Sequence, residues 1–196
     1  MTTVEPPPPP PASPVLGDRR GWWAGGGDQS QVTVDQTPGS VSFTVPATAP
    51  DGFNSSVTTR CRLAGDFDVQ VGFRLDQWSG GDGIWVSLLA ADLGGVNVYR
   101  TDAFGETYGA YFPPNGTPPV SASGSSGQLR LIRAGSEFTG EYDDGSGWRT
   151  LLQGPGSAAP TAVQLGVFNL SNVAPFAGYP TEITFTSLAV TGAFAC

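Results

Sequence analysis

The acidic side chains are the groups that could do acid–base chemistry, because the chain has 17 Asp and Glu but no His and no Lys. Hydrolysis of a glycosidic bond needs two carboxyl groups, about 5 to 5.5 Å apart in retaining enzymes and about 6.5 to 9.5 Å apart in inverting ones. Asp66 and Asp68 would lie about 6.6 Å apart on one face of a strand, and Glu137 and Glu141 about 13 Å apart. Because outward acids are ordinary on strands, we interpret both pairs as solvated surface residues, although acids could also meet across strands. The sequence therefore favours a protein that is not an enzyme and assigns no catalytic residue.

The composition excludes several other kinds of chemistry. Without His the chain lacks the usual general base, the usual zinc ligand and a side chain that titrates near neutral pH. Without Lys it can form neither a Schiff base nor a P-loop phosphate site. The formal net charge of −8, with no basic cluster, argues against nucleic acid as a partner. No segment has the length or apolar character of a membrane span or a secretion signal.

Two cysteines, Cys61 and Cys196, have no His or other Cys close by in the sequence. A metal cluster or a nucleophilic thiol is therefore not expected. If the strands that carry them lie side by side, a disulfide would pin the C-terminus to the strand of Cys61. We predict this disulfide, with two free thiols as the alternative.

The N-terminus contains an unbroken run of prolines, Pro6–Pro11, which favours an extended polyproline II conformation. We expect residues 1–16 to form a Pro-rich tether and residues 17–196 to form one folded domain. A ligand for an SH3-type domain is the alternative interpretation of the prolines. Trp22 and Trp23, just after the tether, are expected to pack the N-terminus onto the domain.

Short segments of alternating apolar and polar residues follow, separated by Gly, Pro, Asn, Asp and Ser, which is typical of strands joined by turns. The clearest is 66–75, whose odd-numbered residues are all apolar. Further strands are predicted at 84–90, 96–100, 107–112, three within 128–151, 163–169 and 181–192. No stretch has helical periodicity. The sequence therefore predicts an all-β fold, a two-sheet antiparallel jelly-roll β-sandwich.

The segment GEYDDGSGWRT, residues 140–150, has the composition of a hairpin tip. Asp143 and Asp144 can bond the local backbone, and Gly145 can adopt a positive φ. We predict a turn here, with Tyr142 and Trp148 packing across the hairpin, rather than a cation or sugar site.

This order of strands and turns resembles the concanavalin A-like lectin/glucanase superfamily, especially its laminin G-like and uncharacterised bacterial members. The resemblance covers roughly residues 20–193 and rests on the segments LAGDFDVQVGFRL, LRLIRAGSEFTGEYDDGSGWRTL, LGVFN and ITFTSLAVTG. It implies a concanavalin A-like β-sandwich. The Glu-x-Asp-x-x-Glu motif of the laminarinase-type branch is missing, and the lyase branch usually employs a His that this sequence lacks. Hydrolase or lyase activity is therefore the third alternative.

In this superfamily the concave sheet is the usual ligand face, which places the candidate site on the polar positions of the middle strands. Sugars pack their C–H patches on aromatic rings and bond their hydroxyls to planar polar groups. The candidate ligand-binding residues are Trp85, Asn97, Tyr99, Tyr111, Gln164 and Phe168, with Trp78 and Asp82 at the rim. The alternative is that these aromatic residues pack beneath a loop.

We expect a non-catalytic, lectin-like module that is extracellular or at the cell surface and binds a glycan or polysaccharide. The alternative is a structural or protein-interaction module of a surface assembly, which would contact protein neighbours through the Pro-rich tether. No cofactor is expected. Calcium stays open as an alternative, because the chain has 17 acids but no run with defined ligand spacing.

Overall fold

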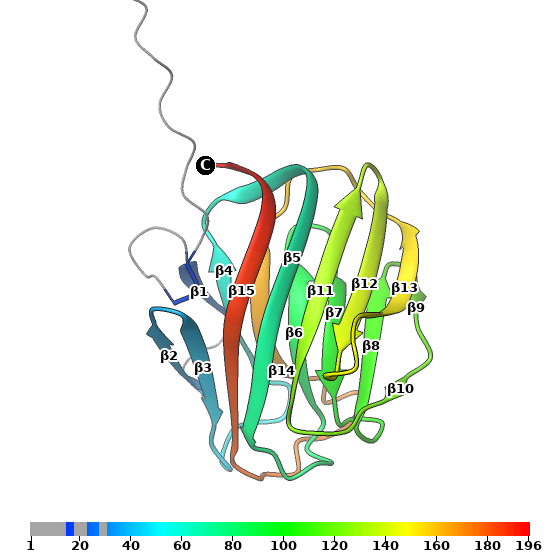
Figure 1. Ribbon diagram of the computed structural model, residues 1–196. Coiled ribbons are helices and arrows are strands. Elements are labelled where there is room, and N and C mark those ends of the chain that lie inside the picture. Colours follow the sequence, from blue (N-terminus) through cyan, green and yellow to red (C-terminus); the bar gives the residue numbers. More distant parts are fainter. Residues whose placement is uncertain (1–14, 18–22, 28–30) are drawn as a thin grey trace, which may run out of the picture.

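The computed structural model describes residues 15–17, 23–27 and 31–196, so Trp22 and most of the expected tether lie outside the described residues. Figure 1 shows two antiparallel sheets stacked face to face, and the described residues contain no helix. The predicted all-β, two-sheet jelly-roll sandwich is confirmed. No helix in this part of the chain has the length and apolar character needed to cross a membrane.

The first sheet carries the candidate site. Its strand order is β1 (Trp23–Gly27), β4 (Asn54–Thr59), β14 (Val163–Asn169), β6 (Ile84–Ala90), β7 (Val96–Thr101), β8 (Thr107–Phe112) and β10 (Val120–Ser121), and β9 (Asn115–Gly116) pairs with β8. The second sheet has the order β13 (Arg149–Pro155), β12 (Glu137–Asp143), β11 (Ser126–Ala134), β5 (Arg62–Gln77), β15 (Thr181–Ala195), β3 (Ser40–Val45) and β2 (Thr33–Thr37).

The core lies between the two sheets and follows from the alternation in the sequence. In β5 the odd-numbered residues from Phe67 to Leu75 are at most 4% exposed, and their even-numbered neighbours face outward. In β6 the residues Ile84, Val86 and Leu88 are fully buried in the same core. Each such side chain removed from water contributes roughly 1.5 to 3 kcal/mol. The alternation therefore fixes which side chains of each strand reach the outer faces.

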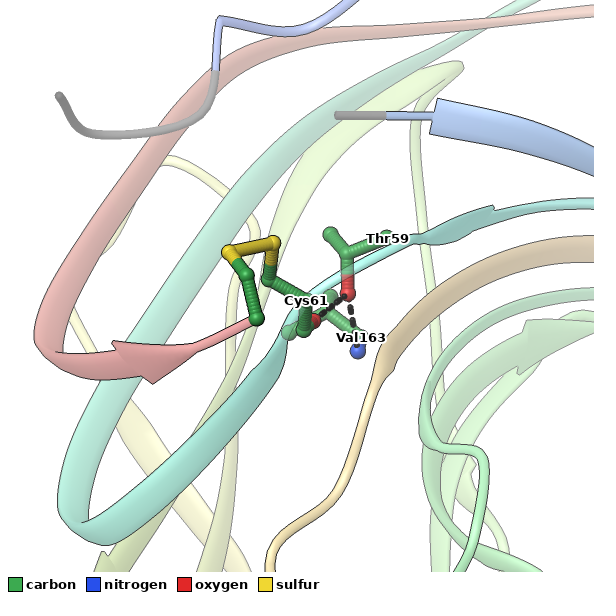
Figure 2. Close-up of a disulfide and its surroundings, with 4 residues drawn as sticks. Thr59, Cys61 and Val163 are labelled. Atoms are coloured by element: carbon green, nitrogen blue, oxygen red, sulfur yellow. Dashed lines mark hydrogen bonds between the residues drawn. A yellow bond between two sulfur atoms is a disulfide. The ribbon is translucent and has the colours of Figure 1, made fainter. Parts of the chain in front are cut away.

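Cys61 and Cys196 form the predicted disulfide, with their Cα atoms 4.5 Å apart (Figure 2). Cys196 directly follows β15, whose last residue, Ala195, pairs with Arg62 at the start of β5. The hydroxyl of Thr59 donates to the Cys61 carbonyl oxygen and accepts the Val163 N–H, both at 2.9 Å. The disulfide is thus tied to both sheets.

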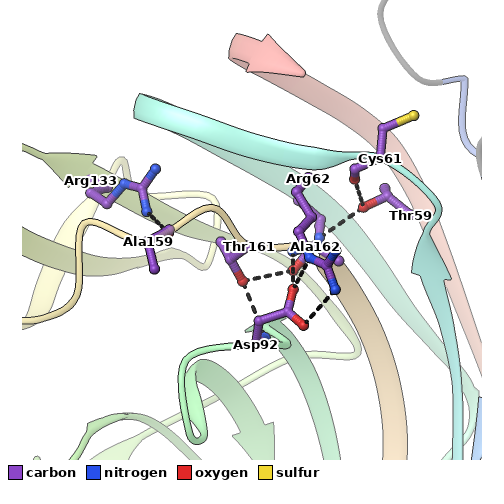
Figure 3. A network of polar contacts seen from close by, with 9 residues as sticks. Thr59, Cys61, Arg62, Asp92, Arg133, Ala159, Thr161 and Ala162 are labelled. Carbon is purple, nitrogen blue, oxygen red and sulfur yellow. Dashed lines mark hydrogen bonds and ion pairs between the residues drawn. The ribbon is translucent and has the colours of Figure 1, made fainter. Parts of the chain in front are cut away.

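A polar network surrounds this end of the sandwich (Figure 3). The Arg62 Nε and the Asp92 carboxylate are 3.0 Å apart, and Asp92 also accepts the Ala162 N–H at 2.9 Å. The guanidinium of Arg133 donates to the carbonyl oxygen of Ala159 at 2.6 Å. Arg62 and Asp92 thus link the start of β5 to the residues before β14, and Arg133 links the same loop to β11.

The N-terminal boundary of the packed chain can be placed from Val15 onward. Leu16, the last residue of the expected tether, is 3% exposed and packs in the core. The Val15 carbonyl accepts the indole N–H of Trp23 at 3.0 Å, and Trp23 is 2% exposed. Trp23 therefore holds Val15 at the sandwich, and a tether would have to end before Leu16.

The turn between β12 and β13 has the predicted Asx chemistry. The Asp143 carboxylate accepts the N–H groups of Gly145 and Gly147 at 2.7 and 2.9 Å. However, Tyr142 and Trp148 do not pack across the hairpin. Tyr142 is buried between the sheets, whereas the Trp148 ring lies against the guanidinium of Arg130 on the outer face. The reason is register: Tyr142 pairs with Arg149, so the preceding Trp148 points to the other side.

Candidate functional site

The candidate site is a pocket of about 230 Å³ on the outer face of the first sheet. It lies over β14, β6, β7 and β8, opposite the side that forms the core. We call it the aromatic pocket. Its lining residues are Trp85, Asn97, Tyr99, Phe104, Tyr111, Phe168, Leu170 and Val173.

Sheet register brings the largest rings together. Trp85 and Phe168 are direct cross-strand partners, and their rings stack with centroids 6.0 Å apart and an interplanar angle of 3°. Phe104, from the loop after β7, meets the Trp85 ring edge-on at 6.2 Å. Trp85 is only 4% exposed, whereas Phe104 is 55% exposed. The pair from the strands forms a fixed floor, and Phe104 stands at its open side.

Tyr99 extends this floor because its partner across the sheet is a glycine. Gly109 is opposite Tyr99 in the register, and a Cβ at residue 109 would collide with the Tyr99 ring. The absence of a side chain lets the ring lie over the backbone of β8. Burial raises the pKa of Tyr99, so its hydroxyl stays protonated well above neutral pH and can donate a hydrogen bond.

Asn97 supplies the pocket with a fixed hydrogen-bond acceptor. Its Nδ2 donates to the Gly95 carbonyl oxygen at 2.7 Å, which fixes the orientation of the amide. Its Oδ1 is buried and has no hydrogen-bond partner among the described residues, and neither has the buried Oγ of Ser87, opposite Tyr99. Leaving a buried acceptor unpaired costs about 1 to 3 kcal/mol. Asn97 lines the pocket and Ser87 does not, so a ligand hydroxyl that reaches Asn97 Oδ1 would remove the cost at that residue.

One wall of the pocket is positioned by Asn169, the last residue of β14. Its Oδ1 accepts the Gly52 N–H at 2.9 Å, and its Nδ2 donates to the carbonyl oxygens of Gly83 and Ala174 at 2.7 and 2.9 Å. These bonds hold the following turn, which carries Leu170 and Val173, against the outer face.

The structure brings Trp85, Asn97, Tyr99, Tyr111 and Phe168 into one pocket, but it places the remaining candidates elsewhere. Gln164 is half-buried on β14 and is separated from Asn97 by Leu89 of β6. Trp78 donates its indole N–H to Glu106 at 2.7 Å. Asp82 is 1% exposed and accepts the Thr181 hydroxyl at 3.3 Å. Trp78 therefore ties its loop to Glu106, and Asp82 ties the same loop to the start of β15 at Thr181.

Phe104, Leu170 and Val173 line the pocket but were not among the candidates. All three lie in loops, where alternation gives no direction for a side chain. Phe104 did carry a signal, because an aromatic residue inside the short polar stretch TDAFGE has no strand to join. Leu170 and Val173 carried none.

The carboxylates that line hollows or were considered from the sequence have bonding partners within the described part of the chain. A second hollow, of about 410 Å³, is lined by Asp76, Trp78, Arg100 and Glu106 among others. Asp76 is ion-paired with Arg74, and Glu106 with Arg100. The hydrogen bond from Arg74 lowers the pKa of Asp76, whereas a general acid needs a raised one.

The acids considered from the sequence are also partnered. Asp68 on β5 and Glu141 on β12 are separated by β11, and both pair with Arg130 of that strand, at 2.6 and 3.0 Å. The Asp66 carboxylate accepts the Gly135 N–H at 2.6 Å, and Glu137 accepts from Gln153 at 2.5 Å. Burial raises the pKa of Asp82, and its carboxylate accepts the Tyr179 N–H and the Thr181 hydroxyl, both at 3.3 Å. The described residues also contain no group of three or more acids or cysteines arranged to hold a metal ion.

Solved structures with the same architecture include sugar-binding proteins. The exoplasmic/lumenal domain of VIP36 in its Ca2+/Man3GlcNAc-bound form is 12% identical, with a TM-score of 0.59 over 89% of this chain and 86% of that chain. The Emp47p carbohydrate recognition domain is 12% identical, with a TM-score of 0.55 over 92% and 94%. Rv0315 of Mycobacterium tuberculosis, described as an immunostimulatory antigen and pseudo beta-1,3-glucanase, is 15% identical, with a TM-score of 0.58 over 95% and 88%.

The chain therefore has the concanavalin A-like β-sandwich fold that legume-type lectins share. No protein-family model matches its sequence, and no curated protein sequence matches it either.

Proposed function

We propose that this protein is a non-catalytic carbohydrate-binding module that holds a glycan in the aromatic pocket. The observation that carries the proposal is the fixed aromatic floor of Trp85, Phe168 and Tyr99 beside an unpartnered acceptor, Asn97 Oδ1. Aromatic faces bind the C–H patches of a sugar ring, and a few placed polar atoms select its hydroxyls. The lectin-like neighbours support a glycan as the ligand class.

The setting that we propose is extracellular or at a cell surface, within the laminin G-like branch of the fold. The Cys61–Cys196 disulfide supports this setting, because disulfides persist in oxidising compartments. The Pro-rich residues before Leu16 would then serve as a spacer.

A glycan array and a polysaccharide pull-down with the whole chain test the proposal. We expect binding that is weakened in Tyr99→Ala and Tyr111→Ala, by about tenfold for the loss of one aromatic contact, and both variants change residues at the pocket without opening the core. Circular dichroism must show that both variants keep the parent fold. Running the panel with EDTA and with added calcium tests whether the ligand needs the ion. Absence of binding across a broad panel would contradict the proposal.

A second candidate, a protein-interaction module, is favoured by the rim of the pocket. Phe104, Leu170 and Val173 are 55%, 40% and 42% exposed and lie around one opening. Apolar side chains gathered in this way are typical of surfaces that bind other proteins. If the glycan panel is negative, a loss of affinity for a partner protein in Phe104→Ser would favour this candidate.

A further inference from the structure

The composition of the aromatic pocket favours an uncharged ligand. None of its lining residues is Asp, Glu or Arg, and the whole chain carries a formal net charge of −8. An acidic sugar would therefore enter without a counter-charge and against the field of the protein. A cationic sugar would lose its hydration without gaining a carboxylate partner. The pocket thus favours uncharged sugars over both acidic and basic ones.

The pocket is also small and has one open side. Its volume of about 230 Å³ is below the range of about 300 to 1,000 Å³ that is usual for pockets that bury drug-sized ligands. Phe104 stands at the open side and is 55% exposed. A sugar residue would therefore place one substituent inside the pocket and rest a C–H face of its ring on Phe104.

Asn97 restricts which substituent fits. Its Nδ2 donates to the Gly95 carbonyl oxygen, so the buried Oδ1 is an acceptor, and it has no hydrogen-bond partner among the described residues. A sugar hydroxyl can donate to it, but that hydroxyl brings an oxygen whose own lone pairs need donors. An amide N–H brings a donor and no lone pair. Among aromatic rings, the amide N–H therefore leaves fewer polar atoms unpaired.

The other two parts of an acetamido group also find partners in the pocket. Its carbonyl oxygen can accept from a phenol hydroxyl, and both Tyr99 and Tyr111 line the pocket. Burial raises the pKa of Tyr99, so this hydroxyl keeps the proton that it donates. The acetamido methyl group is apolar and can pack on the rings of Trp85 and Phe168. One donor, one acceptor and one methyl group are thus all accommodated.

Sheet register keeps the polar partners within reach of a single amide. Asn97 and Tyr99 lie on the same face of β7, with Cα atoms about 6.6 Å apart at strand rise. Tyr111 of β8 is the direct partner of Asn97, and the Tyr99 hydroxyl lies above Gly109 of the same strand. An amide with a hydrogen bond of about 2.9 Å at each end spans about 7 to 8 Å. One acetamido group is therefore long enough to link Asn97 with either tyrosine.

We propose that the aromatic pocket recognises the acetamido group of an uncharged N-acetylhexosamine residue. The amide N–H donates to Asn97 Oδ1, the amide carbonyl accepts from Tyr99 or Tyr111, and the methyl group packs on the aromatic floor. The sugar ring stays at the open side against Phe104. This inference rests on the proposed glycan-binding function and narrows it to one class of sugar.

The test compares sugars that differ only in this substituent, by calorimetric titration of the whole chain. The first pair is the β-1,4-linked tetramers of N-acetylglucosamine and of glucose. The second pair is the methyl glycosides of N-acetylgalactosamine and of galactose. In at least one pair we expect the acetamido sugar to bind about tenfold more tightly, which is the effect of about one net hydrogen bond. The tetramer of glucosamine, whose amine is charged, should bind more weakly than its acetylated form.

Two variants separate recognition of the amide from a merely structural role of Asn97. Asn97→Leu removes the acceptor, so the ratio of the two affinities within the preferred pair should fall to about one. Gln164→Leu is the matched control, because Gln164 is also a half-buried amide on the outer face of this sheet but does not line the pocket. It should leave the ratio unchanged. A ratio that stays the same in Asn97→Leu would contradict the role given to Asn97.

The outcomes distinguish this inference from the proposed function. Binding of some glycan in the broad panel, with no preference for the acetamido sugar in either pair, would overturn the inference and leave the proposed function standing. Absence of binding by every glycan would overturn both. If N-acetylalanine methylamide, which has the amide but no sugar ring, binds as tightly as the preferred sugar, the sugar class is wrong and the protein-interaction candidate is favoured.

Discussion

The two outer faces of this sandwich differ in whether their polar side chains have ion-pair or hydrogen-bond partners. On the second sheet, Arg130 pairs with Asp68 and Glu141 and lies against the ring of Trp148. On the first sheet, the aromatic pocket has rings that contact one another, together with a buried acceptor that has no partner in the described structure.

This difference concerns whether the polar groups of a surface already have bonding partners or could gain one from a ligand. The polar groups around Arg130 already bond to each other, so a ligand there would have to replace existing contacts. In the aromatic pocket a ligand would add contacts to the rings and could pair Asn97 Oδ1. The region around Arg130 is thus internally paired, and we call the face that carries the aromatic pocket the receptive face.

The largest expected effect concerns stability and should leave the receptive face intact. The disulfide joins residues separated by 135 positions in the sequence. In the chain-entropy model, closing a loop of that length stabilises the fold by about 5 kcal/mol. We expect the Cys61→Ser and Cys196→Ser double variant to lose about that much in chemical denaturation and to keep the parent's ligand affinity under native conditions. A large loss of affinity in the folded variant would show that the two regions are coupled.

Asn169→Ala is expected to have the next largest effect on stability and also to displace one wall of the aromatic pocket. It removes three hydrogen bonds, to Gly52, Gly83 and Ala174, each worth about 1 kcal/mol. Stability should fall by about 3 kcal/mol, and ligand affinity should fall because the wall that carries Leu170 is no longer held. Asn172→Ala, an exposed neighbour in the same turn, is the control and should change neither quantity.

The two faces can be compared directly with one aromatic residue from each. Tyr99→Ala should weaken ligand binding by about tenfold, which corresponds to about 1.4 kcal/mol and is within the range for one aromatic contact. Trp148→Ala removes a ring from the opposite face and should leave binding unchanged in calorimetric titration. Equal losses in both variants would contradict the distinction between the faces.

The smallest expected effect is on how the free energy of unfolding depends on pH. Hydrogen bonds from Arg130 lower the pKa of Asp68 below its ordinary value. This pairing therefore contributes stability above the unfolded-state pKa of about 3.9, and the contribution is lost as pH falls through the lower folded-state pKa. The parent should lose up to about 1 kcal/mol more stability than Asp68→Asn between about pH 5 and pH 2.

Ligand affinity should not show the pH dependence that stability shows. The aromatic pocket is lined by no carboxylate, and its titratable residues are tyrosines. Titrations at pH 5 and pH 8 should therefore give the same affinity for an uncharged ligand. A marked pH dependence would place the ligand near a carboxylate, for example on the face around Arg130.

The sequence predicted the fold and part of the candidate site because both depend on alternation. In β6 and β7, alternate residues enter the core, so Trp85 and Tyr99 had to face outward. The disulfide was predictable because the chain has no other cysteine. That these residues bind a ligand stays a prediction.

The directions of side chains in loops and turns could not be predicted from the alternation of apolar and polar residues. Trp78 and Asp82 lie in a loop, and their directions are set by contacts with Glu106 and Thr181 that the sequence does not reveal. Trp148 was assigned to the wrong side of its hairpin because the register, which pairs Tyr142 with Arg149, was not known.

The most direct test of the central claim is to map where a bound oligosaccharide lies by following backbone amide chemical shifts during a titration. The ligand would be the best binder of the glycan panel. The account predicts that the largest shifts fall in β6, β7, β8 and the end of β14, with little change in β5, β11 and β12. Shifts centred on β5, β11 and the 143–147 turn would show that the ligand binds the other face and would contradict the account.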